Sequence, residues 1–187
     1  MEKTPDVLER VHELVARVDE LCSKDAIREC IYRINRGIDR IDEQLLESGF
    51  HPDAIVCWGT NEPLELAAWI KEAIRVQHTT ERVQHLVGNI LIELRGDEAD
   101  VESYEIARHL TAMRDDMKDL IVASRYIDKF VRRDGAWRIV RRDKVIDWIR
   151  ALEGSDELYD QVPHRGKRDG SDISLERFGA KVFHPAI

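Results

Sequence analysis

The 187-residue sequence lacks the features of a disulfide-linked or membrane-spanning protein. Its three cysteines, Cys22, Cys30 and Cys57, are odd in number and show no Cys-x-x-Cys spacing, which argues against a disulfide framework and against a structural zinc site. No stretch approaches the ~20 consecutive apolar residues of a membrane span, and the N-terminus has no apolar signal-peptide core. We therefore predict a cytoplasmic protein without a membrane partner.

A basic excess is missing as well. The formal net charge is −8, the pI is about 5.4, and acidic and basic residues alternate along the chain, so we expect no nucleic-acid partner. The sequence contains no Gly-rich phosphate loop, no dinucleotide fingerprint and no Gly-x-Ser-x-Gly motif. His51 and His78 have no carboxylate at the spacing of metal ligands. We predict neither a cofactor nor a metal ion.

The composition that is present is typical of a globular protein, with 43% hydrophobic and 35% charged residues. The length fits one domain. Beyond Leu152 the composition changes, because glycine and proline punctuate a polar stretch with little periodicity. These shifts predict a domain over residues 1–152 and an irregular C-terminal tail over residues 153–187, which is a candidate for contact with a neighbouring subunit.

The first half of the chain shows mainly helical periodicity. Apolar residues spaced by three and four over residues 7–22 predict an amphipathic helix. Ser23 is a suitable N-cap for a second helix, whose apolar face is formed by the isoleucines and Cys30 of residues 27–41. Residues 54–58 then predict a short strand, and residues 64–76 a third helix.

The second half changes to the pattern of strands. Four runs are rich in β-branched or aromatic residues, and they cover residues 83–94, 99–111, 120–132 and 137–148. The connections between them are short and polar: Gly96-Asp97, residues 114–118, and Asp134-Gly135. Strands joined by such short turns must be antiparallel. Helices followed by an antiparallel meander predict an α+β fold.

Three parts of the chain together resemble a known family. They are residues 27–42 followed by Phe50-His-Pro-Asp-Ala54, the segment from Thr80 to His85-Leu-Val-Gly-Asn89, and residues 125–130 followed by Asp134-Gly-Ala-Trp-Arg-Ile139. Their order and spacing resemble the SnoaL-like, nuclear-transport-factor-2-like superfamily over residues 20–150, in the branch of scytalone dehydratase, LinA dehydrochlorinase and bile-acid 7α-dehydratase. The resemblance implies a curved antiparallel sheet that N-terminal helices wrap into a cone-shaped barrel with an internal pocket.

The same resemblance implies an Asp-His pair. Asp39 at the end of the second predicted helix matches the aspartate that holds a histidine, here His85, on the following long strand. A neutral imidazole in an apolar pocket can remove a proton from carbon, while a carboxylate orients the ring and stabilises the imidazolium. If the strand is regular, His85 shares its face with Val83, Val87, Asn89 and Leu91.

Two observations qualify this pair. On a regular helix Asp39 lies more than about 90° from the centre of the isoleucine stripe, so it reaches His85 only if the helix lies across the mouth of the cone. Ile34 occupies the place where related enzymes carry a polar assistant. A core or rim histidine bonded to a backbone carbonyl is the alternative interpretation of His85.

Several other polar or aromatic residues are candidates for contact with a substrate. Tyr32, Asn35, Tyr104, His109 and Tyr126 are possible replacements for the missing polar assistant, although each also fits a purely structural role. Related enzymes carry a pocket arginine near the end of the last strand, and we favour Arg142 over Arg141 for that position. The predicted substrate-binding residues are Tyr32, Asn35, Trp58, Asn89, Tyr104, Tyr126 and Arg142.

We therefore predict a cofactor-independent lyase, a dehydratase or dehydrohalogenase, that acts on a hydrophobic cyclic small molecule. His85 abstracts the proton, Asp39 orients His85, and Asn89 or Arg142 stabilises the developing negative charge. Two alternatives stay open: a non-catalytic protein that binds a small hydrophobic ligand, and an isomerase or cyclase of ketosteroids or polyketides. The resemblance also implies a homodimer or homotrimer in which sheets pack together.

Overall fold

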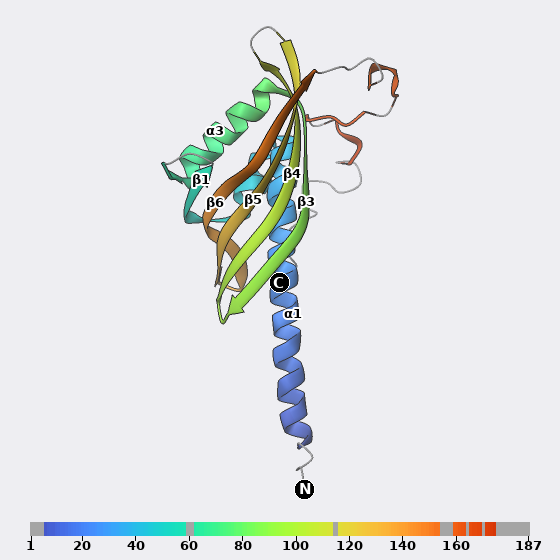
Figure 1. The fold of residues 1–187 in the computed structure, drawn as a ribbon. Coiled ribbons are helices and arrows are strands. Elements are labelled where there is room, and N and C mark those ends of the chain that lie inside the picture. Colours follow the sequence, from blue (N-terminus) through green and yellow to red (C-terminus); the bar gives the residue numbers. More distant parts are fainter. Residues whose placement is uncertain are drawn as a thin grey trace.

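The computed structural model describes residues 6–58, 62–113, 116–153, 159–163, 165–169 and 171–174. Its helices are α1 (Val7–Arg40), α2 (Glu43–Glu47) and α3 (Leu66–Thr79), with a short 3-10 turn at Tyr159–Gln161. Its strands are β1 (Phe50–Trp58), β2 (Leu64–Glu65), β3 (Thr80–Arg95), β4 (Glu98–Met113), β5 (Asp116–Arg133) and β6 (Ala136–Glu153). Together they form the α+β fold in Figure 1, with the helices beside one curved sheet.

Helix α1 is one continuous element, so our prediction of two helices separated by a cap at Ser23 is wrong. Neither glycine nor proline interrupts the chain between Val7 and Arg36, and Ser23 is buried within the helix. The helix ends at Ile41, whose left-handed backbone (φ 55°) directs its N–H back to the carbonyls of Gly37 and Ile38. The N-terminal half of α1 extends beyond the sheet (Figure 1). No helix in the described residues is long and apolar enough to cross a membrane.

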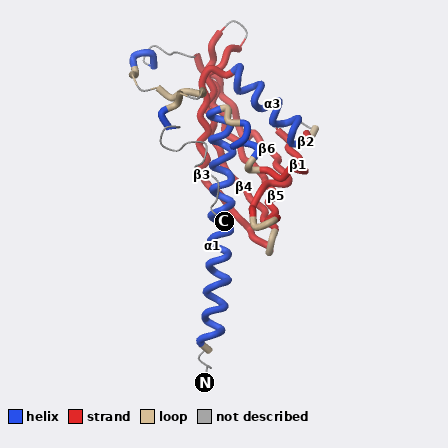
Figure 2. The backbone as a smooth tube through the Cα atoms, turned by 180° about the vertical axis from the view of Figure 1, so that it is seen from behind, coloured by secondary structure: helices blue, strands red, loops and turns tan. Residues whose placement is uncertain are grey.

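The sheet has six strands in the order β2-β1-β6-β5-β4-β3. The predicted antiparallel meander is confirmed for β3 to β6. Strand β1, however, pairs with β6 in parallel, which makes the sheet mixed, and the sheet stays open (Figure 2). Short turns determine the orientation only of the strands they join, and no turn joins β1 to β6.

Two of the predicted turns are confirmed. Asp134 and Gly135 both have positive φ, 53° and 76°, which is the conformation of a type I′ hairpin turn. Gly96 also has positive φ, 66°, between β3 and β4. The third predicted connection falls partly on residues 114–115, which lie outside the described residues, and β5 begins at Asp116.

The core lies where the C-terminal half of α1, α2 and α3 pack against one face of the sheet. Ile27, Ile31 and Ile34 of α1 are completely buried there. Trp69 of α3 lies 5.2 Å from the Phe50 ring, measured between centroids, and meets Trp58 edge-on. The aromatic side chains therefore anchor α3 to β1.

The packing of α1 against α2 depends on Gly37, and we expect Gly37→Ala to destabilise the protein. A Cβ at Gly37 would lie 2.6 Å from the backbone nitrogen of Leu46 and 2.9 Å from its Cα. Alanine favours a helix by about 1 kcal/mol over glycine, but the overlap with backbone atoms forces the helices apart at a cost of about 1–3 kcal/mol. Urea unfolding measures the net effect. Gly88→Ala, where the new methyl group meets nothing within 4 Å, is the control, and an equal loss in both variants would contradict the account.

The described parts of the predicted tail contact their own chain. Tyr159 stacks on Arg82 of β3, with 3.8 Å between the guanidinium carbon and the ring centroid. Arg168 donates hydrogen bonds to the carbonyls of Gln77 (2.9 Å) and Thr80 (2.7 Å), at the junction of α3 and β3. The segment around Arg168 therefore packs beside the C-terminal end of α1 and the start of β3.

Candidate active site

Asp39 and His85 meet where the end of α1 passes β3. Strand β3 is the edge of the sheet, so one of its sides faces α1 and not another strand. Asp39 Oδ1 lies 2.7 Å from His85 Nδ1, and the His85 backbone N–H donates to Asp39 Oδ2 at 3.3 Å. An ionised carboxylate can only accept, so Nδ1 carries the hydrogen and Nε2 of the neutral ring keeps its lone pair. The side chains are 15% and 4% exposed, respectively.

Asp39 reaches His85 even though it lies to one side of the isoleucine stripe of α1, because β3 covers that side of the helix. The isoleucines of α1 pack into the core, and β3 lies along the adjacent flank. On the same side, Arg168 donates to the Asp39 carbonyl at 3.1 Å. Asp39 is therefore held by β3 on its carboxylate and by the C-terminal segment on its backbone.

A second histidine lies beside the pair. The ring of His109 on β4 is 5.3 Å from the ring of His85, measured between centroids, and the rings are nearly perpendicular at 87°. Burial lowers the pKa of His109 to about 4, and repulsion from Lys144 and from the protonated form of His85 adds to this effect. His109 is accordingly a neutral neighbour of His85 at neutral pH.

The depressed pKa of His109 predicts a loss of stability in acid. The unfolded chain binds this proton near pH 6.5 and the folded chain only near pH 4, so the stability is fully present above pH 6.5 and falls as the pH drops to 4. The shift corresponds to about 3 kcal/mol. Urea unfolding at several pH values should show a shallower decline for His109→Gln than for the unmodified protein. Parallel declines would contradict the account.

A buried charged network continues from the histidines across the sheet. Lys144 on β6 donates to Glu105 Oε2 on β4 and to the Tyr126 hydroxyl on β5, both at 3.1 Å. Ser124 also donates to Glu105 Oε2, at 3.0 Å. Burial alone would raise the pKa of Glu105, but the Lys144 charge, the protonated form of His85 and the hydrogen bonds from Lys144 and Ser124 outweigh burial and keep that pKa below its usual value.

The same network affects Lys144 and Tyr126. Burial alone would lower the pKa of Lys144, but Tyr126 and Glu105 outweigh it and raise that pKa. Burial raises the pKa of Tyr126, and the Glu105 charge adds to this. Lys144 is therefore a charged donor, and Tyr126 is a protonated phenol.

Arg142 and Asp128 form a buried ion pair next to this network. The guanidinium donates two hydrogen bonds to the carboxylate, at 2.8 and 2.7 Å, and the side chains are 1% and 0% exposed. The Asp128 charge outweighs the effect of burial and raises the pKa of Arg142 above its usual value. The Arg142 guanidinium carbon also lies 4.1 Å from the centroid of the Tyr126 ring. Arg141, one residue earlier, is exposed and pairs with Asp143.

The remaining predicted substrate-binding residues divide into two groups. Asn35, Trp58 and Tyr126 are buried or half-buried, and the Trp58 ring centroid lies 5.8 Å from Lys144 Nζ. Tyr32 and Tyr104 are exposed, at 44% and 40%.

Asn89 is also exposed, so the prediction that it shares the face of His85 is wrong. The β3–β4 register shifts between Val87 and Ile90, and this irregularity reverses the alternation. Ile90 therefore points inward and Leu91 outward, opposite to the faces we expected.

The sequence interpretation missed Glu105 and Lys144. Lys144 follows the inward Arg142 by two residues, and Glu105 precedes His109 by four, so strand alternation offered a signal for both. We expected apolar surroundings for His85, whereas this side of the sheet carries buried charges. Two surface depressions, of about 260 and 480 Å³, lie elsewhere and do not include Asp39 or His85. Among the described residues, no group of histidine, cysteine and acidic side chains is arranged to hold a metal ion.

A curved open sheet with N-terminal helices packed on it is the cone fold of small α+β proteins, and the Asp39–His85 pair lies where α1 meets β3. The model of the SnoaL-like domain matches residues 19–143, and the chain belongs to the SnoaL-like family. A comparison with curated protein sequences found no match.

Solved structures show the same fold. A putative scytalone dehydratase from Novosphingobium aromaticivorans is 22% identical, with a TM-score of 0.63 over 73% of this chain and 91% of that one. The hexachlorocyclohexane dehydrochlorinase LinA-type3 from Novosphingobium barchaimii is 18% identical, with a TM-score of 0.68 over 74% and 96%. At these identities the likeness concerns the fold.

Proposed function

We propose that the protein is a cofactor-independent lyase, a dehydratase or dehydrohalogenase, in which His85 removes a proton from carbon. The observation that carries this proposal is the hydrogen bond between Asp39 and His85 Nδ1, because it leaves Nε2 as the basic atom of a nearly buried ring. The negative carboxylate stabilises the imidazolium that forms during proton transfer.

The proposed step is an elimination. His85 Nε2 takes the proton, the electron pair of the broken C–H bond forms a carbon–carbon double bond, and the bond to the leaving group on the adjacent carbon breaks. A hydroxyl group leaves as water after it receives a proton, and a halogen leaves as halide. A donor near the leaving group therefore determines which of the two reactions is faster.

Tyr126 and Lys144 are the proposed donors, and they replace Asn89 in that role. Lys144 donates to the Tyr126 oxygen, and among the described contacts the phenol hydrogen has no acceptor. Glu105 Oε1 is buried without a hydrogen-bond partner in the described part of the chain, so it is free to bind a substrate hydroxyl. Glu105 lies opposite Val87, two residues from His85 along β3. This polar set favours a substrate that carries oxygen.

The names of the similar structures agree with an elimination, since they include a putative dehydratase and a dehydrochlorinase. The donors favour one second candidate, a ketosteroid or polyketide isomerase or cyclase. In that reaction Tyr126 and Lys144 stabilise an enolate oxygen, and His85 returns the proton to another carbon.

Product masses in deuterated water distinguish these functions. The full-length protein is incubated with hydroxysteroids, chlorinated cyclohexanes and polyketide hydrates, and the products are analysed by mass spectrometry. We expect products that have lost water or hydrogen chloride. Products of unchanged composition that carry deuterium at carbon would favour the isomerase. Ligands that bind without turnover or deuterium exchange would favour a non-catalytic binding protein and contradict the proposal.

A further inference from the structure

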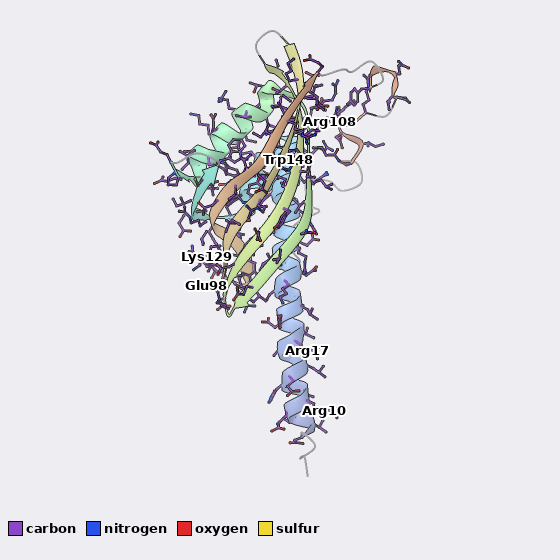
Figure 3. The ribbon with its side chains drawn as sticks, in the orientation of Figure 1. Arg10, Arg17, Glu98, Arg108, Lys129 and Trp148 are labelled. Carbon is purple, nitrogen blue, oxygen red and sulfur yellow. The ribbon has the colours of Figure 1, made fainter. Side chains whose placement is uncertain are left out.

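The N-terminal half of α1 carries an apolar stripe that the described residues of the chain leave exposed. Its large apolar residues are between 46% and 74% exposed, and they are Val7, Leu8, Val11, Leu14, Val15, Val18 and Leu21. Figure 3 shows Arg10 and Arg17 on the part of α1 that extends past the end of the sheet. Residues 7–22 span about 24 Å at 1.5 Å per residue. A continuous stripe of this length is characteristic of an interface and not of a solvated surface.

This segment is largely an addition to the family fold. The SnoaL-like domain begins at residue 19, and the similar structures are matched over 91% and 96% of their own length by only 73% and 74% of this chain. The stripe therefore serves a purpose that the domain itself does not require.

The stripe and the core-facing side of α1 point in nearly opposite directions. At 100° per residue, the stripe is centred about 175° from Ile27, Ile31, Ile34 and the other isoleucine that packs on the sheet. Arg132 also fixes the direction of the helix, because it donates to Asp19 at 3.2 Å and to Asp97 at 2.7 Å. The stripe consequently faces away from the part of the domain that the structure describes.

The spacing of the stripe is that of a coiled coil. With Val11 and Val18 at heptad position a, position d is occupied by Val7, Leu14 and Leu21, so the spacing alternates between four and three residues. Valine at a with leucine at d favours parallel two-stranded coiled coils. The pattern ends at the next a and d positions, Asp25 and Arg28, where α1 joins the domain.

Charge also favours a parallel pair. The g positions are all basic: Arg10, Arg17 and Lys24. In an antiparallel pair these rows face each other and repel, whereas in a parallel pair each g residue lies over an apolar e residue of the other helix, such as Val15. Four acidic and three basic residues lie between positions 7 and 24, a balance that does not favour an anionic membrane surface.

We propose that residues 7–22 form a parallel two-stranded coiled coil with a second copy of this chain. Because the stripe faces away from the domain, two helices in contact leave both domains on the outside, and α1 diverges from its partner beyond Cys22. This interface is separate from the Asp39–His85 site, and the proposal does not depend on the reaction there. Because two copies must meet to form the interface, the dimer fraction rises with protein concentration.

Sedimentation equilibrium of the full-length protein over a range of concentrations tests the interface. We expect Leu14→Glu with Val18→Glu to halve the molar mass reached at high concentration. The matched control, Ala16→Glu, places the same charge at position f, away from the stripe, and should leave the mass unchanged. Equal masses for the double variant and the unmodified protein would overturn the proposal. A protein that associates only through its sheet would give this result, and so would a monomer whose stripe binds a membrane surface.

Cross-linking tests the parallel direction. In a Cys22→Ser background, Leu21→Cys places thiols at facing d positions of a parallel pair, and we expect a disulfide-linked dimer under mild oxidation. Ala16→Cys in the same background is the control and should cross-link at least tenfold more slowly. Equal rates at the two positions would overturn the parallel arrangement. A folded domain in each variant is verified by a cooperative thermal unfolding transition, whose midpoint is free to move with the state of association.

Discussion

Replacement of His85 by glutamine is expected to lower kcat/KM of the elimination by about 10²–10⁴-fold, the usual contribution of a general base. Glutamine keeps a polar side chain of similar size, but it cannot accept a proton from carbon. Steady-state kinetics with the substrate identified by mass spectrometry measure the loss. The effect should fall on kcat, because His85 acts in the transition state and not in binding alone.

Replacement of Asp39 by asparagine should also slow the reaction, by about 10²-fold or more. The amide has nearly the same shape, yet it removes the negative charge that stabilises the imidazolium and no longer fixes the ring with Nδ1 as the donor. Asp25→Asn, an exposed carboxylate on the same helix, is the matched control and should leave kcat unchanged. Full activity in both Asp39→Asn and His85→Gln would exclude the pair from the mechanism.

The largest effect on stability is expected at the ion pair of Arg142 and Asp128. Asp128→Asn leaves a completely buried guanidinium without its counter-charge, which costs about 3–5 kcal/mol of unfolding free energy. The double variant Asp128→Leu with Arg142→Met removes both charges and should recover much of that loss. Asp143→Asn, which removes the partner of the exposed Arg141, is the control and should change stability little.

Urea unfolding of the four proteins measures these differences. A loss in Asp128→Asn no larger than that in Asp143→Asn would show that the buried pair does not stabilise the fold. A double variant that is less stable than Asp128→Asn would show that the hydrogen bonds of the pair contribute more than its burial costs.

The sequence predicted hairpin turns and the strands beside them, because short-range residue preferences determine these parts of the fold. Asp134-Gly135 adopts the positive φ values that the dipeptide favours, and the runs on either side pair as antiparallel strands. Ser23 shows the opposite case, because a residue that favours an N-cap also fits inside a helix when the turns before and after it continue.

The candidate site depended on contacts that no local pattern encodes. The predicted direction of the Asn89 side chain was wrong because the irregularity in β3 after Val87 has no reliable signature in the sequence. The contact of Arg168 with the Asp39 carbonyl joins residues 129 positions apart, from a segment with little periodicity. Glu105 and Lys144 were detectable by alternation, but charged residues on strands are more often exposed.

In the proposed mechanism, Asp39 holds His85 with Nδ1 as the hydrogen-bond donor and Nε2 as the free base. Nitrogen-15 NMR of the histidine rings, recorded with His85 in its neutral form and assigned by comparison with His85→Gln, tests this claim without any substrate. We predict that Nδ1 of His85 carries the hydrogen in the unmodified protein and that Asp39→Asn weakens this preference. A His85 ring that carries its hydrogen on Nε2 would contradict the account.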